Sequence, residues 1–130
     1  MKNLFIALSA LAIFAFTNPV HVTTVAIDAA ASTITWKGYK VTGSHEGTVK
    51  VREGNLKVDH GTLVGGSFTI DMTSLACTDL EKGQGAEKLV GHLASPDFFN
   101  TKEHTTAKFD ITKTVAYADN EYKIVGNLTI

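Results

Sequence analysis

Hydrophobic and polar residues alternate along most of the chain after Ser32, and a period of two predicts β-strands rather than helices. The clearest case is YKVTGSHEGTVKV at residues 39–51, where one face is rich in lysine and threonine. The pattern predicts a strand over residues 40–52 with one wet and one covered face. The covered face would consist of Val41, Gly43, His45, Gly47, Val49 and Val51. A histidine between two glycines is an unusual filling for such a face.

Five further runs alternate in the same way, at residues 32–38, 56–60, 62–72, 106–117 and 122–130. Two short polar stretches predict hairpin turns, EGN at 53–55 and ADNE at 118–121, because glycine and asparagine accept a positive φ. Gly61 is expected to end one strand, and Lys113 breaks the alternation, which predicts a bulge or a strand end. The chain is therefore expected to form about six antiparallel strands.

One segment, GAEKLVGHLASPDFF at residues 85–99, departs from the alternation. Its apolar residues recur at helical spacing, and Ser95-Pro96 is expected to end the helix. The last strand runs to Ile130 without a stop signal, and an open apolar edge invites aggregation. We therefore expect a fragment with at least two closing strands beyond Ile130, since eight strands close a barrel that holds a small ligand. The predicted fold class is mainly β, an antiparallel barrel that is incomplete here, with one short helical insertion.

The N-terminal residues predict export. Lys2 precedes an apolar stretch at residues 4–16, which is typical of a secretory signal peptide and too short to span a bilayer. We assign residues 1–26 to this signal and residues 30–130 to one domain, located in the periplasm or secreted. The cleavage position is left open among three alanines, Ala15, Ala26 and Ala30.

Composition and motifs narrow the functional classes. The formal net charge is −1 and no basic stripe occurs, which argues against nucleic acid as a partner. The single cysteine, Cys77, cannot form an internal disulfide, and the five histidines are too scattered to predict a metal site. No G-x-S-x-G elbow is present, and Asp79 and Glu81 are expected in a loop without an enclosing pocket. The residues give no argument for an enzyme.

Glycines on the covered faces, among them Gly43, Gly47, Gly66 and Gly126, have two interpretations. They permit bends where a barrel turns a corner, or they leave the interior hollow for a guest. A strand over residues 40–52 would span about 40 Å, which suits an elongated ligand. An apolar lining with few polar groups favours a lipid site over a catalytic one. The expected lining consists of Trp36, Val41, Val49, Val51, Phe68, Ile70, Met72, Phe109, Ile111 and Ile124.

The histidines also have alternative roles. His45 faces inward, either as a hydrogen-bond donor to a ligand head group or as a core histidine satisfied by the backbone or a buried water. His92 lies on the flank of the helix, where it is an exposed or capping group unless the helix is a lid at the barrel mouth. His60 and His104 are expected in a turn and a loop.

Six phrases together resemble the YceI-like family of exported bacterial proteins. They are STITWKG, GSHEG, LVGGSFTIDMTSL, LVGHLASPDFF, AKF and YKIVGNLTI, and they follow the family order over residues 32–130. The resemblance implies an extended lipocalin-like barrel with a helical insertion and a tunnel for a polyisoprenoid or related amphiphile, with no established catalytic residues. It also implies further strands after GNLTI.

Carried over by position, the resemblance places two groups of residues at the tunnel. His45 and the strand residues Phe68, Ile70 and Met72 would lie against it. Leu93, Phe98 and Phe99 would lie near its helical cover, with His92 adjacent. The chain departs from the family where an aromatic-proline pair usually precedes the A-x-F strand, since His104-Thr105 stand there.

The leading hypothesis is an exported binding protein that sequesters or carries a long-chain isoprenoid-type lipid. This hypothesis requires no cofactor, and it allows for a bound isoprenoid or quinone-like lipid. Its partner would be a hydrophobic small molecule, and a homodimer is left open, while the mature chain would have no membrane span. Two alternatives remain: an enzyme or stress factor that acts on such lipids with His45 as a base, and a solid-core barrel that binds a partner without a ligand.

Overall fold

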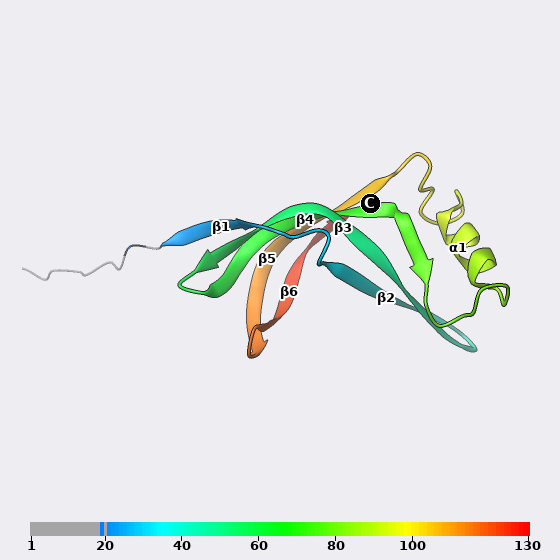
Figure 1. The fold of residues 1–130 in the computed structure, drawn as a ribbon, viewed down its shortest axis with the longest axis horizontal. Helices are drawn as coiled ribbons and strands as arrows, with labels where there is room; N and C mark the ends of the chain where they lie inside the picture. The colour runs from blue at the N-terminus through cyan, green and yellow to red at the C-terminus, as the bar shows by residue number, and fades with distance from the viewer. Residues whose placement is uncertain (1–18, 20) are drawn as a thin grey trace, which may run out of the picture.

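The structure is a computed structural model that describes Pro19 and residues 21–130. These residues form one six-stranded antiparallel sheet and one short helix, which confirms the predicted mainly-β class (Figure 1). The elements are β1 (Val22–Ala26), β2 (Thr33–Lys40), β3 (Gly43–Asp59), β4 (Thr62–Cys77), α1 (Ala86–Ala94), β5 (Thr106–Ala118) and β6 (Glu121–Thr129).

The 17-residue strand β3 organises the sheet. Its second half pairs with β1 and its first half with β2, so these two strands follow one another along one side of β3, while β4 pairs along the other. Between β1 and β2, Oδ1 of Asp28 accepts hydrogen bonds from the backbone N–H groups of Ala30 (3.1 Å) and Ala31 (3.2 Å). This side-chain turn lets the chain leave β1 and return to the same edge. The order then continues through β4 and β5 to β6.

A bulge in β4 between Asp71 and Ala76 interrupts its pairing with β3. The register shifts beside Lys50, and Oδ1 of Asp71 accepts hydrogen bonds from the backbone N–H and the hydroxyl of Thr73 (3.0 and 2.6 Å). The hydroxyl of Ser74 accepts the hydrogen bond of the Lys50 N–H at 2.8 Å, replacing the missing backbone partner. Beyond the bulge, Ala76 and Cys77 pair with β3 again, and the chain then leads to α1, which covers one end of the curved sheet (Figure 1).

Two predicted boundaries are wrong. The stretch 39–51 is not one strand, because Val41 and Thr42 form the turn between β2 and β3. The predicted turn at 53–55 does not exist, because β3 runs through it and Gly54 pairs with Phe68. The strand β1 was not predicted. Four of the six expected strands correspond to β2, β4, β5 and β6, whereas the other two both lie in β3, and this division offsets the omission of β1 in the total.

The other local predictions are confirmed. The helix begins after Gly85, which has a φ of 107°, and ends at Ser95. Chain reversals occur at His60–Gly61 and at 119–120, where His60 and Asn120 both have a positive φ. The ladder between β5 and β6 shifts register just before Lys113. Glycine, asparagine and proline mark these positions strongly in sequence, which explains why they were found.

At most glycines of the covered face, atoms of neighbouring residues already fill the space that a side chain would take. A Cβ built on Gly47 would lie 1.8 Å from the carbonyl oxygen of Ala76 and 2.4 Å from the ring of Trp36. A Cβ on Gly126 would lie 2.2 Å from the oxygen of Asp110 and 2.8 Å from the ring of Phe109. At these positions the absent side chain makes room for an aromatic ring and a close backbone, not for a guest. The hollow-interior interpretation is therefore wrong at Gly47 and Gly126.

The predicted signal peptide mostly lies outside the described residues, which exclude 1–18 and 20. Its last assigned residues, Val22–Ala26, form β1, so cleavage after Ala26 would remove a strand of the sheet. The described part of the chain contains no helix that is long and apolar enough to cross a membrane. In the same part, β6 does not pair with β1 or β2, and closure into a barrel stays a prediction.

Candidate functional site

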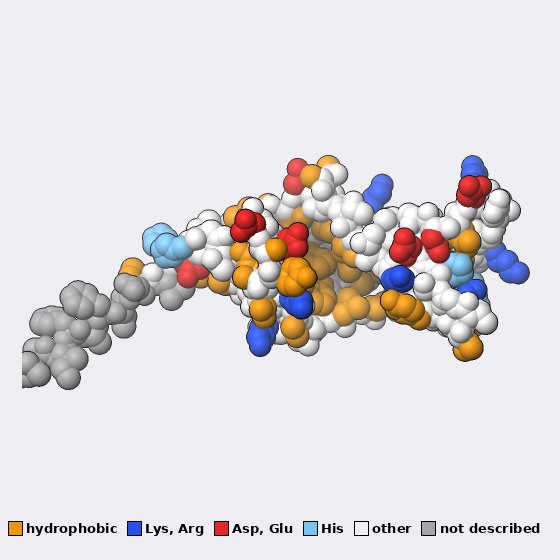
Figure 2. All heavy atoms as spheres, turned by 90° about the horizontal axis from the view of Figure 1, so that it is seen from below, with side chains coloured by type: hydrophobic (Ala, Val, Ile, Leu, Met, Phe, Trp, Pro, Cys, Tyr) orange, Lys and Arg blue, Asp and Glu red, His pale blue; other side chains and the backbone are white. Residues whose placement is uncertain are grey.

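Two adjoining apolar cavities lie on the covered face of the sheet, with volumes of about 330 and 250 Å³. We call them together the apolar trough. The larger lies beside the helix and is lined by Ile34, Trp36, Lys37, Gly38, Val49, Ile70, Met72, Leu75, Leu93, Phe99, Ala107, Leu128 and Ile130. The smaller is lined by Ile27, Ser32, Ile34, Val51, Leu56, Leu63, Phe68, Ile111 and Ile124. Ile34 lines both cavities and so marks their junction. Figure 2 shows hydrophobic side chains gathered in a hollow at the middle of one face.

Strand pairing explains why these side chains share a face. Directly paired residues of neighbouring strands point to the same side of a sheet. Ile34 pairs with Val49, and Val51 with Ile70. Ile70 in turn pairs with Ala107 on β5. Four buried hydrophobic residues form the core and also line the trough, Val49, Val51, Met72 and Ala107.

Most of the predicted lining lies in the trough. Six of the predicted residues line the larger cavity, Trp36, Val49, Ile70, Met72, Leu93 and Phe99. Four line the smaller one, Val51, Phe68, Ile111 and Ile124. Phe109 lies next to the trough, stacks on Phe68 with ring centroids 5.4 Å apart, and covers Gly126.

Four predicted site residues lie elsewhere. Val41 is fully exposed in the β2–β3 turn, so its predicted inward position is wrong. Phe98 is 56% exposed and meets the ring of His92 edge-on, with centroids 4.8 Å apart. His92 also lies 3.7 Å from a carboxylate oxygen of Asp97. The side chains of His92, Phe98 and His45 line neither cavity of the trough.

Several trough residues were missed, for two reasons. Ile34, Leu128 and Ile130 continue the same alternation as predicted neighbours, so the periodicity contained their signal. Ile27, Leu56 and Leu63 could not be assigned, because the turn residues and bulges that place them in the smaller cavity are not visible in the alternation.

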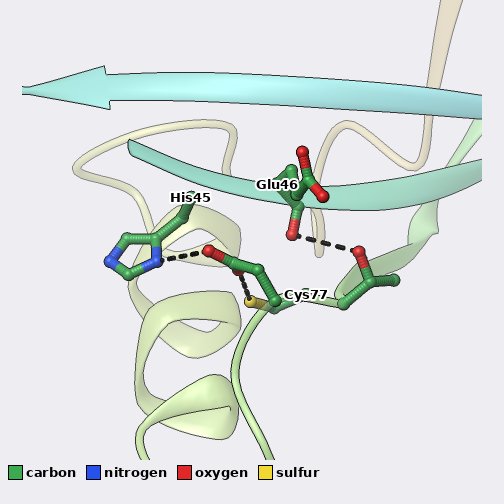
Figure 3. Close-up of polar contacts among 5 residues, drawn as sticks. His45, Glu46 and Cys77 are labelled. Atoms are coloured by element: carbon green, nitrogen blue, oxygen red, sulfur yellow. Dashed lines mark hydrogen bonds and ion pairs between the residues drawn. The ribbon is translucent and has the colours of Figure 1, made fainter. Parts of the chain in front are cut away.

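His45 forms a polar cluster with the loop after β4. Its Nδ1 lies 3.0 Å from Oδ2 of Asp79, and the thiol of Cys77 donates a hydrogen bond to Oδ1 of the same carboxylate at 3.0 Å (Figure 3). Beside them, the backbone N–H of Thr78 donates to the carbonyl oxygen of Glu46 at 2.9 Å. We call these contacts the clasp, because they fasten the loop that leads to α1 onto the start of β3.

The electrostatics of the clasp favour structure over catalysis. The hydrogen bond from Cys77, and secondarily that from His45, lower the pKa of Asp79 from 3.8 to about 2. Burial, together with the hydrogen bond to Asp79, raises the pKa of the Cys77 thiol. A thiol that keeps its proton is a poor nucleophile. The Asp79 carboxylate accepts hydrogen bonds from both the Cys77 thiol and the His45 imidazole, so these two groups are not paired with each other as a nucleophile and its base would be. His45 was expected to donate to a ligand head group or to be a core histidine bonded to the backbone or a buried water. Its partner in the structure is instead the carboxylate of Asp79 in the loop after β4.

Replacing Asp79 with asparagine is expected to destabilise the protein at neutral pH and to have little effect near pH 2. A carboxyl group whose pKa is lowered by folding contributes stability above its unfolded value, near 3.9, and loses it as the pH falls through the folded value of about 2. The difference between wild type and Asp79→Asn in denaturant midpoint, measured from pH 7 to pH 2, should therefore shrink between about pH 4 and pH 2. A constant difference over that range would show that the clasp does not depend on the charge.

No group of three or more histidine, cysteine, aspartate or glutamate side chains is arranged to hold a metal ion in the described part of the chain. A further hollow of about 530 Å³ lies between the end of β4 and α1, lined by residues that include Leu80, Ala86 and Val90. None of the residues of α1 is fully buried. The helix is therefore a lightly packed cover, held by the clasp at one end and by Leu93 and Phe99 at the other.

Comparison with known protein families gives one match. The family model of the YceI-like domain matches residues 26–130, which is most of the chain and includes every element from β2 to β6. No curated protein matches the sequence.

Proposed function

The chain belongs to the YceI-like family, and from this we propose that it is a binding protein that holds a long-chain isoprenoid-type lipid in the apolar trough. Members of this family are generally binding proteins rather than enzymes. We also propose that an export signal within residues 1–26, cleaved ahead of β1 as it would be near Ala15, directs the protein to the periplasm or outside the cell. Residues 30–130 would form the lipid-binding domain.

The observation that carries the proposal is the trough itself. Its two cavities adjoin at Ile34, and the larger one falls within the usual size range of ligand sites. Nearly all of its lining side chains are hydrophobic, so affinity would come from apolar burial at about 25 cal/mol per Å², before the costs of association. Such a lining selects for chain length and shape more than for charge.

An enzymatic role for His45 is less well supported. A base must reach a nucleophile or a substrate proton, but the Nδ1 atom of His45 is engaged with Asp79, and the neighbouring thiol donates to the same carboxylate. His45 does not line either cavity of the trough. Its contacts suit a residue that fixes the cover in place.

Organic extraction of the purified protein, followed by mass spectrometry, is expected to release a long-chain isoprenoid-type lipid in near-stoichiometric amount. Protein stripped of lipid should also take up a polyprenyl or quinone probe in a saturable titration. A stripped sample whose extract contains no such lipid serves as the blank. Absence of both a co-purifying lipid and saturable uptake would exclude the proposed function.

A further inference from the structure

The segment that joins β4 to β5 forms its hydrogen bonds almost entirely within itself. In the described part of the chain, every hydrogen bond of residues 81–104 has both partners inside that range. The clasp at Asp79 fastens the chain just before this range, and the backbone N–H of Met72 donates to the carbonyl oxygen of Thr105 (2.9 Å) just after it. We call residues 81–104 the cover segment. Hydrogen bonds therefore attach it to the sheet only at its two ends.

The cover segment is also lightly packed. Among its residues, all of which the structure describes, Thr101 alone is buried. Its helix α1 packs against β4, and the hollow of about 530 Å³ lies between the end of β4 and the helix. A segment with few buried contacts opens locally at a lower free energy than the sheet on which it rests. The cover segment can therefore open as a unit while β3 and β4 stay paired.

Two side chains of the cover segment reach the apolar trough. Leu93 and Phe99 line the larger cavity together with Val49 of β3 and Ile70 of β4. A hydrocarbon chain in this cavity would touch both the cover segment and the sheet. Its apolar contact with Leu93 and Phe99 exists only while the cover segment is closed, so the ligand has a higher affinity for the closed state and shifts the population toward it.

We infer that the cover segment is a lid whose closure is coupled to occupancy of the trough. The ligand docks the lid through Leu93 and Phe99, while the clasp at Asp79 keeps the base of the lid on β3 in both states. This inference rests on the proposed function and adds a conformational response to it. A partner that contacts α1 would thereby encounter a different surface on the loaded and the empty protein.

Hydrogen–deuterium exchange of wild type, read by mass spectrometry, tests the lid. In lipid-stripped protein, the amides of α1 are expected to exchange at least tenfold faster than those of β3 and β4 around the pair Val51 and Ile70. Saturation with a polyprenyl probe is expected to slow the α1 amides about tenfold or more. The tip of the β5–β6 hairpin, where Ala116 pairs with Tyr122, lines neither cavity and should change less than about twofold.

Two leucines of α1 provide a matched pair of variants. Leu93→Ala removes a side chain that the ligand would touch, whereas Leu89→Ala removes the same side chain at a half-buried position that lines neither cavity of the trough. Both are expected to speed the exchange of α1 in stripped protein. The probe should then slow this exchange in Leu89→Ala as much as in wild type, but no more than about threefold in Leu93→Ala.

The results separate the lid from the proposed function. Saturable binding of the probe without slower exchange of α1 would overturn the lid and leave the proposed function intact. The lid also fails if the α1 amides of stripped wild type exchange no faster than those of β3 and β4, because the segment then opens only with the whole sheet. If wild type shows no saturable uptake of the probe, both fail. The wild-type comparison decides these outcomes even if Leu93→Ala does not fold.

Discussion

Replacement of Gly47 with alanine is expected to lower the free energy of unfolding by about 3 kcal/mol or more. The new methyl group would lie 1.8 Å from the carbonyl oxygen of Ala76 and 2.4 Å from the ring of Trp36, so β3 must move away from β4 and the indole must leave its place. Because the new methyl group would meet backbone on one side and the ring of Trp36 on the other, the structure cannot relax around it without moving one of them. Equilibrium denaturation measures the loss, and tryptophan fluorescence should report the displaced ring.

Gly91 provides the matched control. It lies in the middle of α1, and a Cβ at this position meets no atom within 4 Å. Gly91→Ala is expected to raise the free energy of unfolding by about 0.5–1 kcal/mol, because alanine is the better helix former. Equal effects of the two substitutions would show that glycine propensity, not the contact with Trp36, sets the stability at Gly47.

The comparison of Gly47 with Gly54 shows why the role of a glycine inside a strand could not be predicted from the sequence. Both glycines lie inside β3, but the sequence suggested a bend or a hollow interior at Gly47 and a hairpin turn at Gly54. In the structure a Cβ on Gly54 would lie 2.6 Å from that of Phe68 on the next strand. A glycine that admits a neighbouring strand and a glycine that turns the chain look the same in one sequence, because the distinction depends on long-range pairing.

The turn at Val41–Thr42 was not predicted for the opposite reason, because its residues lack the local signal of a turn. Neither residue is a turn former, and only Gly43, with a φ of 152°, marks the place where the chain reverses. The helix and the turns at Gly61 and Asn120 were predicted because their signals are local. Sequence patterns therefore located the elements whose causes lie within a few residues.

In the candidate site, too, features with local causes were predicted and features set by long-range contacts were not. Alternation placed Val49, Ile70 and Met72 on one face, since the side-chain period of a strand depends only on the strand itself. The contact of His45 with Asp79 joins residues 34 positions apart and could not be read from spacing.

Ile34→Asp is expected to weaken lipid binding at least tenfold. Ile34 lines both cavities, so a carboxylate at this position would stand at the junction of the trough, where a bound chain must pass. Covering an unpaired charge with a hydrocarbon chain costs several kcal/mol, and a tenfold loss corresponds to only about 1.4 kcal/mol. Ile34 is only half-buried on β2, so the fold is expected to tolerate the change. Uptake of a polyprenyl probe by stripped protein measures the loss.

Thr35→Asp introduces the same charge one residue along the same strand. Thr35 is exposed, pairs with Thr48 and points to the face opposite the trough, so its replacement should leave probe affinity within about twofold of wild type. Denaturation of both variants separates lost binding from lost folding. If folded Ile34→Asp binds as tightly as Thr35→Asp, the ligand does not pass between the two cavities, and the trough is not one continuous site. A selective loss in Ile34→Asp instead places the ligand chain across the junction, because only that position joins the two halves.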